Sequence, residues 1–212
     1  MDKTGVLIVD SQLIAVQLFE TIIRDSGRYE LICSVSDPEQ AYYRCSHDKV
    51  GLILMDVFAE LGAAGLDIAA RIKQDFPNIP IIILASDPEV SFIDRAREAG
   101  ANSFWYKDIQ SEPLLSVMDR TVGGESVFPI RTPEVQLGKV SSYHLTEREL
   151  EVLRELVMGR TNEQIGKNLG ISVETVRNHV ANMFNKTGFS TRTELAVRAR
   201  ETGLVIPEPG KR

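Results

Sequence analysis

The stretch Gly51-Leu52-Ile53-Leu54-Met55-Asp56 is an unbroken apolar run that ends on a carboxylate. Similar short apolar runs occupy four other parts of the first half of the chain: residues 5–9, 31–35, 81–84 and 104–106. Runs this short and this uniformly apolar are typical of β-strands that are buried on both faces. The first half of the chain therefore predicts five strands of one buried sheet.

Segments with helical periodicity separate these runs, for example residues 13–23, 66–76 and 90–99. Strands that alternate with helices form parallel sheets, because each connection must cross back over the sheet before the next strand begins. A last helix is expected after Ser111 as its N-cap, with Glu112 and Pro113 in its first turn and Gly123-Gly124 at its end. Residues 1–122 are predicted to form a doubly wound α/β domain with a five-stranded parallel sheet in flavodoxin-like order.

The second half of the chain is organised by helical periodicity instead. Residues 123–142 carry Gly, Pro and Ser at short intervals, which is typical of a linker. Beyond them, glycines separate four expected helices: residues 146–158, 162–169, 172–187 and 191–202. Residues 143–206 are therefore predicted to form a small all-α four-helix domain, followed by a short tail at residues 207–212.

Composition excludes several classes of protein. The chain is 43% hydrophobic, which is enough for real cores, and no apolar stretch approaches the roughly 20 residues that span a membrane. The N-terminus has no basic segment followed by an apolar run, so we expect a cytoplasmic protein without membrane association. Cys33 and Cys45 lie in or beside apolar runs without metal-ligand spacing, and we expect small core residues rather than a disulfide.

The net charge of −6 conceals a difference between the two halves of the chain. Residues 1–143 carry 13 Lys/Arg against 21 Asp/Glu, a balance of −8, and residues 144–212 carry 11 against 9, a balance of +2. This distribution excludes a protein that coats nucleic acid through bulk charge. It places any anion-binding surface in the second half.

Three charged side chains follow strands of the predicted sheet. Asp10, Asp56 and Lys107 each come directly after an apolar run, and the carboxyl ends of parallel strands meet at one edge of a sheet. Two carboxylates and an ammonium there can bind a divalent cation and present one carboxylate as a nucleophile toward phosphorus. The alternative for each residue is an ordinary turn former or helix cap.

The pattern resembles the receiver domain of response regulators, which accepts a phosphoryl group from a histidine kinase, and the resemblance extends over residues 3 to 122. It implies Asp56 as the phosphoacceptor, Asp10 and Asp56 as Mg²⁺ site residues, and Lys107 as the phosphate-contacting lysine. It also implies a cognate histidine kinase as partner, and it places Phe104 at the aromatic switch position.

Three departures from the receiver pattern bear on phosphorylation. Ser11 stands where receivers usually have a second acidic metal ligand, so Mg²⁺ is expected to have one direct ligand fewer. Ala85 stands where the fourth strand usually ends on Thr or Ser, and Ser86 can replace that hydroxyl only if the chain bends, because successive strand side chains point to opposite faces. The loop at residues 57–65 is about one residue longer than usual.

A metabolic enzyme is the rival interpretation of the first half, and we do not expect the chain to be an enzyme. Phosphatases of the haloacid dehalogenase type need a second Asp two residues after the nucleophile, whereas Gln12 stands two residues after Asp10. The stretch from Gly62 to Gly65 lacks the Lys and the spacing of a P-loop.

The third helix of the second half has one apolar and one polar side. Val176, Val180 and Phe184 are spaced for burial, and the opposite side carries these residues: Arg177, Asn178, Ala181, Asn182 and Asn185. Arg can contact guanine, Asn can contact adenine, and Ala fits beside a thymine methyl group in the major groove. The preceding helix and its Gly170 turn complete a helix-turn-helix layout. The alternative is an ordinary solvated helix in a small bundle.

Residues 145–149, 162–166 and 171–179 resemble the LuxR-type helix-turn-helix, and the resemblance extends over residues 141–206. It implies the base-facing residues Arg177, Asn178 and Ala181. It implies phosphate contacts by Thr161, Asn162, Thr175, His179 and Lys186, although His179 could equally be a packed polar residue. It also implies binding to duplex DNA as a homodimer, for which the surface at residues 194–198 is a candidate, although that last helix could instead simply close the four-helix core.

Together the two halves resemble the NarL/FixJ group of response regulators. The resemblance implies a DNA-binding transcriptional regulator of a two-component system whose output is controlled by phosphorylation of Asp56. One alternative keeps DNA binding but makes the first domain a pseudo-receiver that works without phosphorylation. Another is a phosphorelay or scaffold protein whose second domain binds protein.

Overall fold

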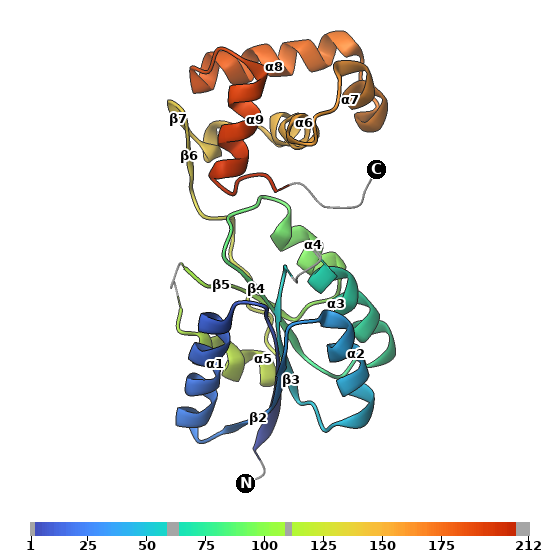
Figure 1. Ribbon diagram of the computed structural model, residues 1–212, viewed down its shortest axis with the longest axis vertical. Coiled ribbons are helices and arrows are strands. Elements are labelled where there is room, and N and C mark those ends of the chain that lie inside the picture. Colours follow the sequence, from blue (N-terminus) through green and yellow to red (C-terminus); the bar gives the residue numbers. More distant parts are fainter. Residues whose placement is uncertain (1–2, 59–63, 109–111, 207–212) are drawn as a thin grey trace. The chain divides into compact units, whose positions relative to one another are not determined.

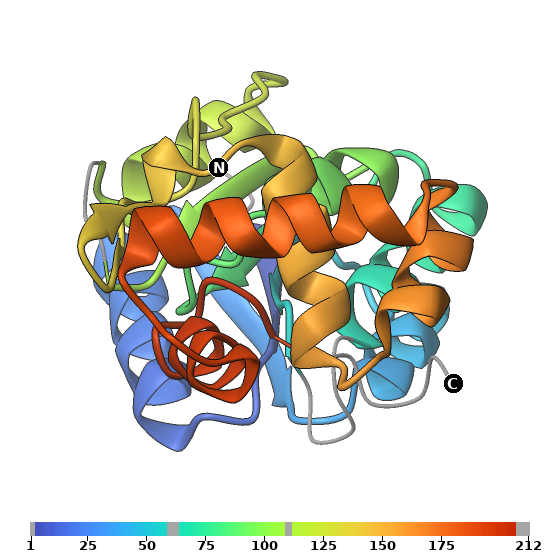
Figure 2. The same cartoon turned by 90° about the horizontal axis from the view of Figure 1, so that it is seen from above.

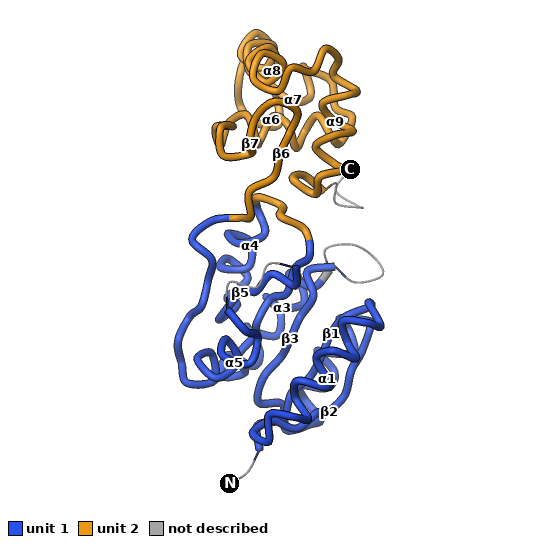
Figure 3. The backbone as a smooth tube through the Cα atoms, turned by 90° about the vertical axis from the view of Figure 1, so that its left-hand side faces the viewer, with its two compact units in different colours: residues 1–86, 91–131, 209–212 blue, residues 87–90, 132–208 orange. Residues whose placement is uncertain are grey.

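The computed structural model describes residues 3–58, 64–108 and 112–206. The described residues form two compact units, one within residues 3–86 and 91–131 and the other of residues 87–90 and 132–206, and Figure 3 colours them separately. Within the described ranges, no helix is both long enough and apolar enough to cross a membrane.

The first unit is built on a five-stranded parallel sheet in the order β2-β1-β3-β4-β5. Its strands are β1 (Thr4–Val9), β2 (Tyr29–Val35), β3 (Leu52–Asp56), β4 (Ile81–Ala85) and β5 (Ser103–Tyr106). The helices between and after them are α1 (Leu13–Ser26), α2 (Pro38–His47), α3 (Ala64–Asp75), α4 (Phe92–Glu98) and α5 (Leu114–Val122). Figure 1 shows α1 and α5 on one face of the sheet and α2, α3 and α4 on the other. The predicted doubly wound class is confirmed.

Burial explains why the central strands are continuously apolar. The edge strand β2 differs from the expectation, because only Tyr29 and Val35 of it are buried. All five residues of β3 and all five of β4 are buried, because helices cover both faces of the sheet. On the face covered by α1 and α5, Phe19 meets Trp105 edge to face, with ring centroids 6.4 Å apart. Trp105 is the single tryptophan of the chain, so its fluorescence reports on this core alone.

The start of α5 differs from the sequence expectation. The helix begins at Leu114, so Glu112 and Pro113 precede it, and Ser111 lies outside the described residues. A residue before proline is disfavoured in helical conformation, which explains why Glu112 does not open the helix. Its carboxylate instead accepts hydrogen bonds from Ser116 and Arg120.

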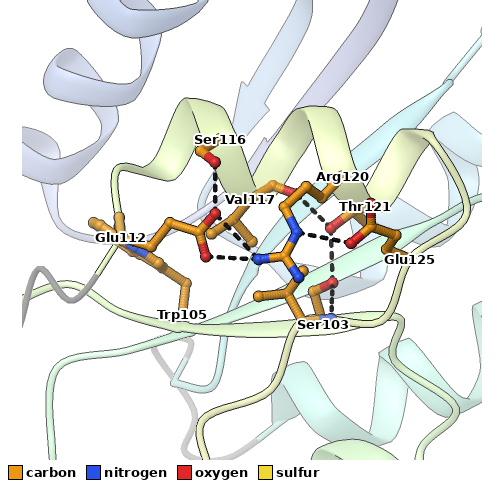
Figure 4. A network of polar contacts seen from close by, with 9 residues as sticks. Ser103, Trp105, Glu112, Ser116, Val117, Arg120, Thr121 and Glu125 are labelled. Carbon is orange, nitrogen blue, oxygen red and sulfur yellow. Dashed lines mark hydrogen bonds and ion pairs between the residues drawn. The ribbon is translucent and has the colours of Figure 1, made fainter.

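A network of hydrogen bonds and ion pairs connects residues 125–127, which follow α5, with α5 and β5 (Figure 4). Arg120 forms ion pairs with Glu112 and Glu125. The Ser103 hydroxyl lies 2.7 Å from the Thr121 hydroxyl and accepts from the Val127 amide, while the Phe104 amide donates to the Val127 carbonyl. The expected linker at 123–142 is therefore divided, because its first part pairs with the edge strand of the first unit.

The second unit contains a two-stranded hairpin of β6 (Gln136–Leu137) and β7 (Val140–Ser141), followed by the short 3-10 helix η1 (Ser142–His144). Four α-helices follow: α6 (Glu147–Val157), α7 (Asn162–Leu169), α8 (Val173–Thr187) and α9 (Arg192–Glu201). Figure 2 shows α6 running crosswise to α8. The hairpin and the first residue of η1 lie within the segment expected to be a linker, residues 123–142, which therefore contains regular structure.

Local hydrogen bonds at the helix ends set the boundaries in this unit. Thr146 and Thr161 open α6 and α7 through capping boxes with Glu149 and Gln164, and Ser172 caps α8. Gly170 ends α7 with a φ of 65°, a conformation that glycine adopts without strain.

Residues 87–90 belong to the second unit although they lie between β4 and α4 in the sequence. Glu89 is buried and forms an ion pair with Arg154 of α6 at 3.1 Å, and Val90 packs against the core of this unit. The expected helix at 90–99 accordingly begins only at Phe92.

Candidate functional site

The three charged residues at the carboxyl edge of the sheet lie together. The Lys107 ammonium is 2.7 Å from Asp10 Oδ2 and 3.2 Å from Asp56 Oδ2. Their side chains are almost inaccessible, with exposed fractions of 0% for Asp10, 5% for Asp56 and 8% for Lys107. One buried ammonium therefore faces two buried carboxylates, as the strand-end pattern predicts.

Strand order explains how residues 97 positions apart meet. Asp10 follows β1, Asp56 ends the neighbouring β3, and Lys107 follows β5, which is separated from β3 by β4. The Lys107 amide donates to the carbonyl of Ala85 at the end of β4, which fixes where the Lys107 side chain starts. Asp10 is held by the Gln12 amide, which donates to its Oδ1 at 2.8 Å.

Burial dominates the electrostatics of Asp56. Desolvation by burial raises the pKa of Asp56 most, the attraction of Lys107 lowers it and the Asp10 charge raises it, and together these effects place it at about 6. A carboxyl with this pKa is mostly ionised at pH 7, and the nucleophilic form needs that charge. A cation that joins Lys107 would offset the repulsion between the two carboxylates.

The donor set fits Mg²⁺ bound through two carboxylates and water. This ion is commonly held by one or two carboxylates together with waters and substrate phosphate. Ser11 is exposed and offers a hydroxyl in place of a third carboxylate. Among the residues that the structure describes, no group of three His, Cys, Asp or Glu side chains is placed to hold a metal.

The three residues considered for the switch, Ala85, Ser86 and Phe104, have different surroundings. Ala85 is buried at the end of β4 and brings a methyl group but no hydroxyl, and Ser86 is half-buried beside it. Phe104 is buried and packs edge to face against Tyr106, with ring centroids 4.9 Å apart. That Ser86 can replace the missing hydroxyl only if the chain bends stays a prediction. Residues 59–63 of the long loop lie outside the described residues.

Gly65 also shapes the surroundings of Asp56, which sequence reasoning missed. A side-chain carbon added to Gly65 would overlap the backbone carbonyl of Asp56. The close approach of the first turn of α3 to the end of β3 therefore requires glycine. The sequence shows only a glycine directly before the expected helix at residues 66–76. Nothing in the neighbouring residues indicates that the backbone of Asp56 approaches this glycine.

The structure separates the faces of α8 as predicted. Of the residues expected on the apolar side, Val176 is buried and Val180 and Phe184 are partly buried against the same core, to which Met183, not expected there, also belongs. The residues expected on the polar side are exposed: Arg177, Asn178, Ala181, Asn182 and Asn185. Arg177 forms a surface ion pair with Glu174 at 3.0 Å, and both side chains are more than half exposed. Such a pair contributes little to stability, so the guanidinium is available to another partner.

The residues expected to contact phosphate are less uniform. Thr161 is exposed and Thr175 and His179 are half-buried, whereas the side-chain oxygen of Asn162 accepts a hydrogen bond from Arg192 at 2.9 Å. The Lys186 ammonium is already bonded within the unit, to the Glu149 carboxylate at 2.7 Å. Phosphate contact by these residues stays a prediction.

The sequence family described as response regulator receiver domain matches residues 6–119, more than half of the chain. The chain belongs to this family. The family described as bacterial regulatory proteins, luxR family, matches residues 143–199, so this response regulator carries a LuxR-type DNA-binding domain. The combination is that of transcription regulators in two-component systems, a group that is not normally enzymatic.

Relatives and solved structures share this domain order. The response regulator is 28% identical to the transcriptional regulatory protein YdfI of Bacillus subtilis (strain 168), covering 94% of this chain and 97% of the relative. It is also 28% identical to the response regulator protein VraR of Staphylococcus aureus (strain Mu3 / ATCC 700698), covering 94% and 98%. A structure of two RcsB dimers bound to two parallel DNAs has a TM-score of 0.63 at 16% identity and covers 94% and 98%, which supports the fold.

Neutralising Asp56 should stabilise the metal-free receiver. Because burial raises the pKa of Asp56 above its ordinary value of 3.8, the folded chain binds this proton more tightly than the unfolded chain. The stability that protonation of Asp56 contributes to the folded chain is present at low pH and is lost as the pH rises through about 6. We expect Asp56→Asn to raise the free energy of unfolding by about 1–3 kcal/mol at pH 7.

Urea unfolding followed by Trp105 fluorescence measures this difference, in buffer with a chelator. Added Mg²⁺ should stabilise the wild-type chain more than Asp56→Asn, because only the former keeps both carboxylates. A variant less stable than the wild type in the chelator would contradict the assigned cause of the raised pKa.

Proposed function

We propose that this response regulator is a transcription regulator whose binding to duplex DNA is controlled by phosphorylation of Asp56 by a histidine kinase. The observation that carries the proposal is the shared position of Lys107 between the Asp10 and Asp56 carboxylates, 2.7 and 3.2 Å away. A nucleophilic carboxylate, a second carboxylate for a cation and an ammonium for phosphoryl charge are what transfer to an aspartate requires. We further propose that the protein acts in the cytoplasm, because its proposed output is DNA binding.

The chemical step follows from these positions. An oxygen of the ionised Asp56 carboxylate attacks phosphorus, the bond to the donor's leaving group breaks, and an acyl phosphate forms on Asp56. Lys107 holds the phosphoryl oxygens through its ammonium. Mg²⁺, held by Asp10 and Asp56, would neutralise phosphoryl charge during transfer.

DNA binding is assigned to the exposed face of α8. Arg177 suits guanine, Asn178 suits adenine and Ala181 suits a thymine methyl group in the major groove. Thr161, Asn162, Thr175 and His179 are proposed to contact phosphates around this face. A structure described as RcsB bound to a promoter in the presence of phosphomimetic BeF₃⁻ supports this output, and RcsB dimers on DNA support a homodimer here.

Intact mass after incubation with Mg²⁺ and acetyl phosphate tests the phosphoacceptor. We expect the wild-type chain to gain about 80 Da, the mass of one phosphoryl group, and Asp56→Asn to gain nothing. Asp67→Asn is the matched control, since Asp67 is an exposed carboxylate on α3 and should leave the gain unchanged.

The second candidate function is a pseudo-receiver that regulates the same DNA binding without phosphorylation. Ser11 and Ala85 favour it, because the site lacks a third carboxylate and the hydroxyl that usually follows the phosphoryl group. No mass gain under conditions that modify another receiver would select this candidate. So would a phosphorylated chain whose affinity for DNA equals that of the unmodified chain.

A further inference from the structure

Lys186 lies in the last turn of α8 and points back into its own unit. Its ammonium is 2.7 Å from Glu149 Oε2 and 3.0 Å from the backbone carbonyl of His144. The Glu149 side chain is only 3% exposed, whereas Lys186 is one-third exposed. Two of the three donor positions of the ammonium are therefore used inside the protein.

Glu149 joins this lysine to the start of α6. The same Oε2 accepts from the Thr146 amide at 2.8 Å and from the Thr146 hydroxyl at 3.1 Å. Burial works against the charge on Glu149, but the hydrogen bonds from Lys186 and Thr146 outweigh it and lower its pKa. An ionised, buried carboxylate thus connects the capping box of α6 with the end of α8.

The C-terminal end of α8 is fixed from a second side by the hairpin. The Lys139 amide donates to the carbonyl of Thr187 at 2.8 Å, and Thr187 is buried. Arg177 lies nine residues before Lys186, which is about 13 Å along a helix. A tilt of about 5° at the anchored end would move Arg177 by roughly 1 Å over this length, enough to spoil a bidentate contact with a base.

We propose that Lys186 is a positioning residue, which sets the orientation of α8 through Glu149 and His144 and does not contact DNA phosphate. The inference rests on the proposed function, in which α8 reads bases. It replaces the phosphate contact that the resemblance implies for Lys186. It also gives the buried Glu149 a function beyond capping its own helix.

The two roles of Lys186 have different signatures in DNA binding. Loss of a phosphate contact weakens binding to all sequences alike and reduces the slope of log K against log salt by about 1. Loss of a positioning contact lowers the preference for a selected sequence over a shuffled one and leaves that slope unchanged, because no counterion is displaced at Lys186.

The experiment uses the full chain and a duplex enriched by selection from a random library, with a shuffled duplex of equal length. The variants are Lys186→Met, Glu149→Gln and the double variant, which removes both charges and leaves neither partner buried alone. Fluorescence anisotropy gives the affinity for each duplex at several salt concentrations, at a temperature where circular dichroism shows every variant folded.

We expect each single variant to lower the ratio of selected to shuffled affinity by about tenfold. The double variant should be no worse than the worse single variant, because both changes break the same contact. All three should keep the wild-type salt slope.

Either of two results would overturn the inference while leaving the proposed function intact. The salt slope could fall by about 1 in both variants that lack Lys186 but not in Glu149→Gln, which would make Lys186 a phosphate contact. The ratio could also stay at the wild-type value in all folded variants, which would make the ion pair purely stabilising. A wild-type chain that enriches no duplex would overturn both proposals.

Discussion

Lys107→Met should lower the free energy of unfolding of the receiver unit by about 3–5 kcal/mol in metal-free buffer at pH 7. The substitution keeps most of the apolar stem but leaves Asp10 and Asp56 facing each other without a cation, with side chains 0% and 5% exposed. Removing one member of a buried ion pair is far more costly than removing both, because the remaining charge loses water and partner together. Urea unfolding followed by Trp105 fluorescence measures the loss.

A second substitution and added Mg²⁺, each tested in the Lys107→Met variant, separate the effect of the lost charge from the effect of lost packing. Asp56→Asn combined with Lys107→Met should recover about 2 kcal/mol or more, since it removes one of the two facing carboxylates. Mg²⁺ should also recover part of the loss in Lys107→Met, because the cation can take the position of the missing charge.

Lys73→Met is the matched control. The Lys73 ammonium is partly buried but bonds only neutral oxygens, from Pro77, Ile79 and Asn102. Its removal should cost less and should respond neither to Asp56→Asn nor to Mg²⁺. Two results would contradict the assigned role of the Lys107 charge. The free energy of unfolding of Lys107→Met could lie within about 1 kcal/mol of the wild-type value, or adding Asp56→Asn to Lys107→Met could lower it further.

Arg177→Ala should abolish the preference of the DNA-binding domain for guanine at one position in each half-site. A bidentate contact between arginine and guanine is worth about 1–3 kcal/mol of discrimination, so the loss is about 10- to 100-fold per half-site. In a dimer both half-sites lose it together. The measurement is the position-specific enrichment of each variant in selection from the same random library.

Arg97→Ala supplies the control for this experiment. Arg97 forms an ion pair with Asp94 at 3.1 Å, three residues apart on α4 of the first unit, and both side chains are about half exposed or more, like those of the Arg177–Glu174 pair. It should leave the enriched sequence unchanged, even if it alters total affinity. An enriched sequence that is the same for Arg177→Ala and the wild type would remove Arg177 from the base-reading face.

Features encoded over a few neighbouring residues were predictable from the sequence. The uniformly apolar runs placed all five strands of the sheet, and the pairs Thr146–Glu149 and Ser172–Thr175 set helix starts through bonds only three residues apart. The hydrophobic period of α8 predicted which side is buried. These signals are local, because a helix cap or a buried face depends on the spacing of adjacent residues.

Tertiary structure decided what each long charged side chain contacts. Lys107 reaches Asp10 across 97 positions, and Lys186 reaches Glu149 across 37 positions. The first contact was predictable because strand ends meet at one edge of a parallel sheet, whatever the separation in sequence. The second was not, because a lysine at the rim of a helix can point to solvent, to DNA or back into the fold with the same spacing. Only the packing of α6 against α8 places a buried carboxylate within its reach.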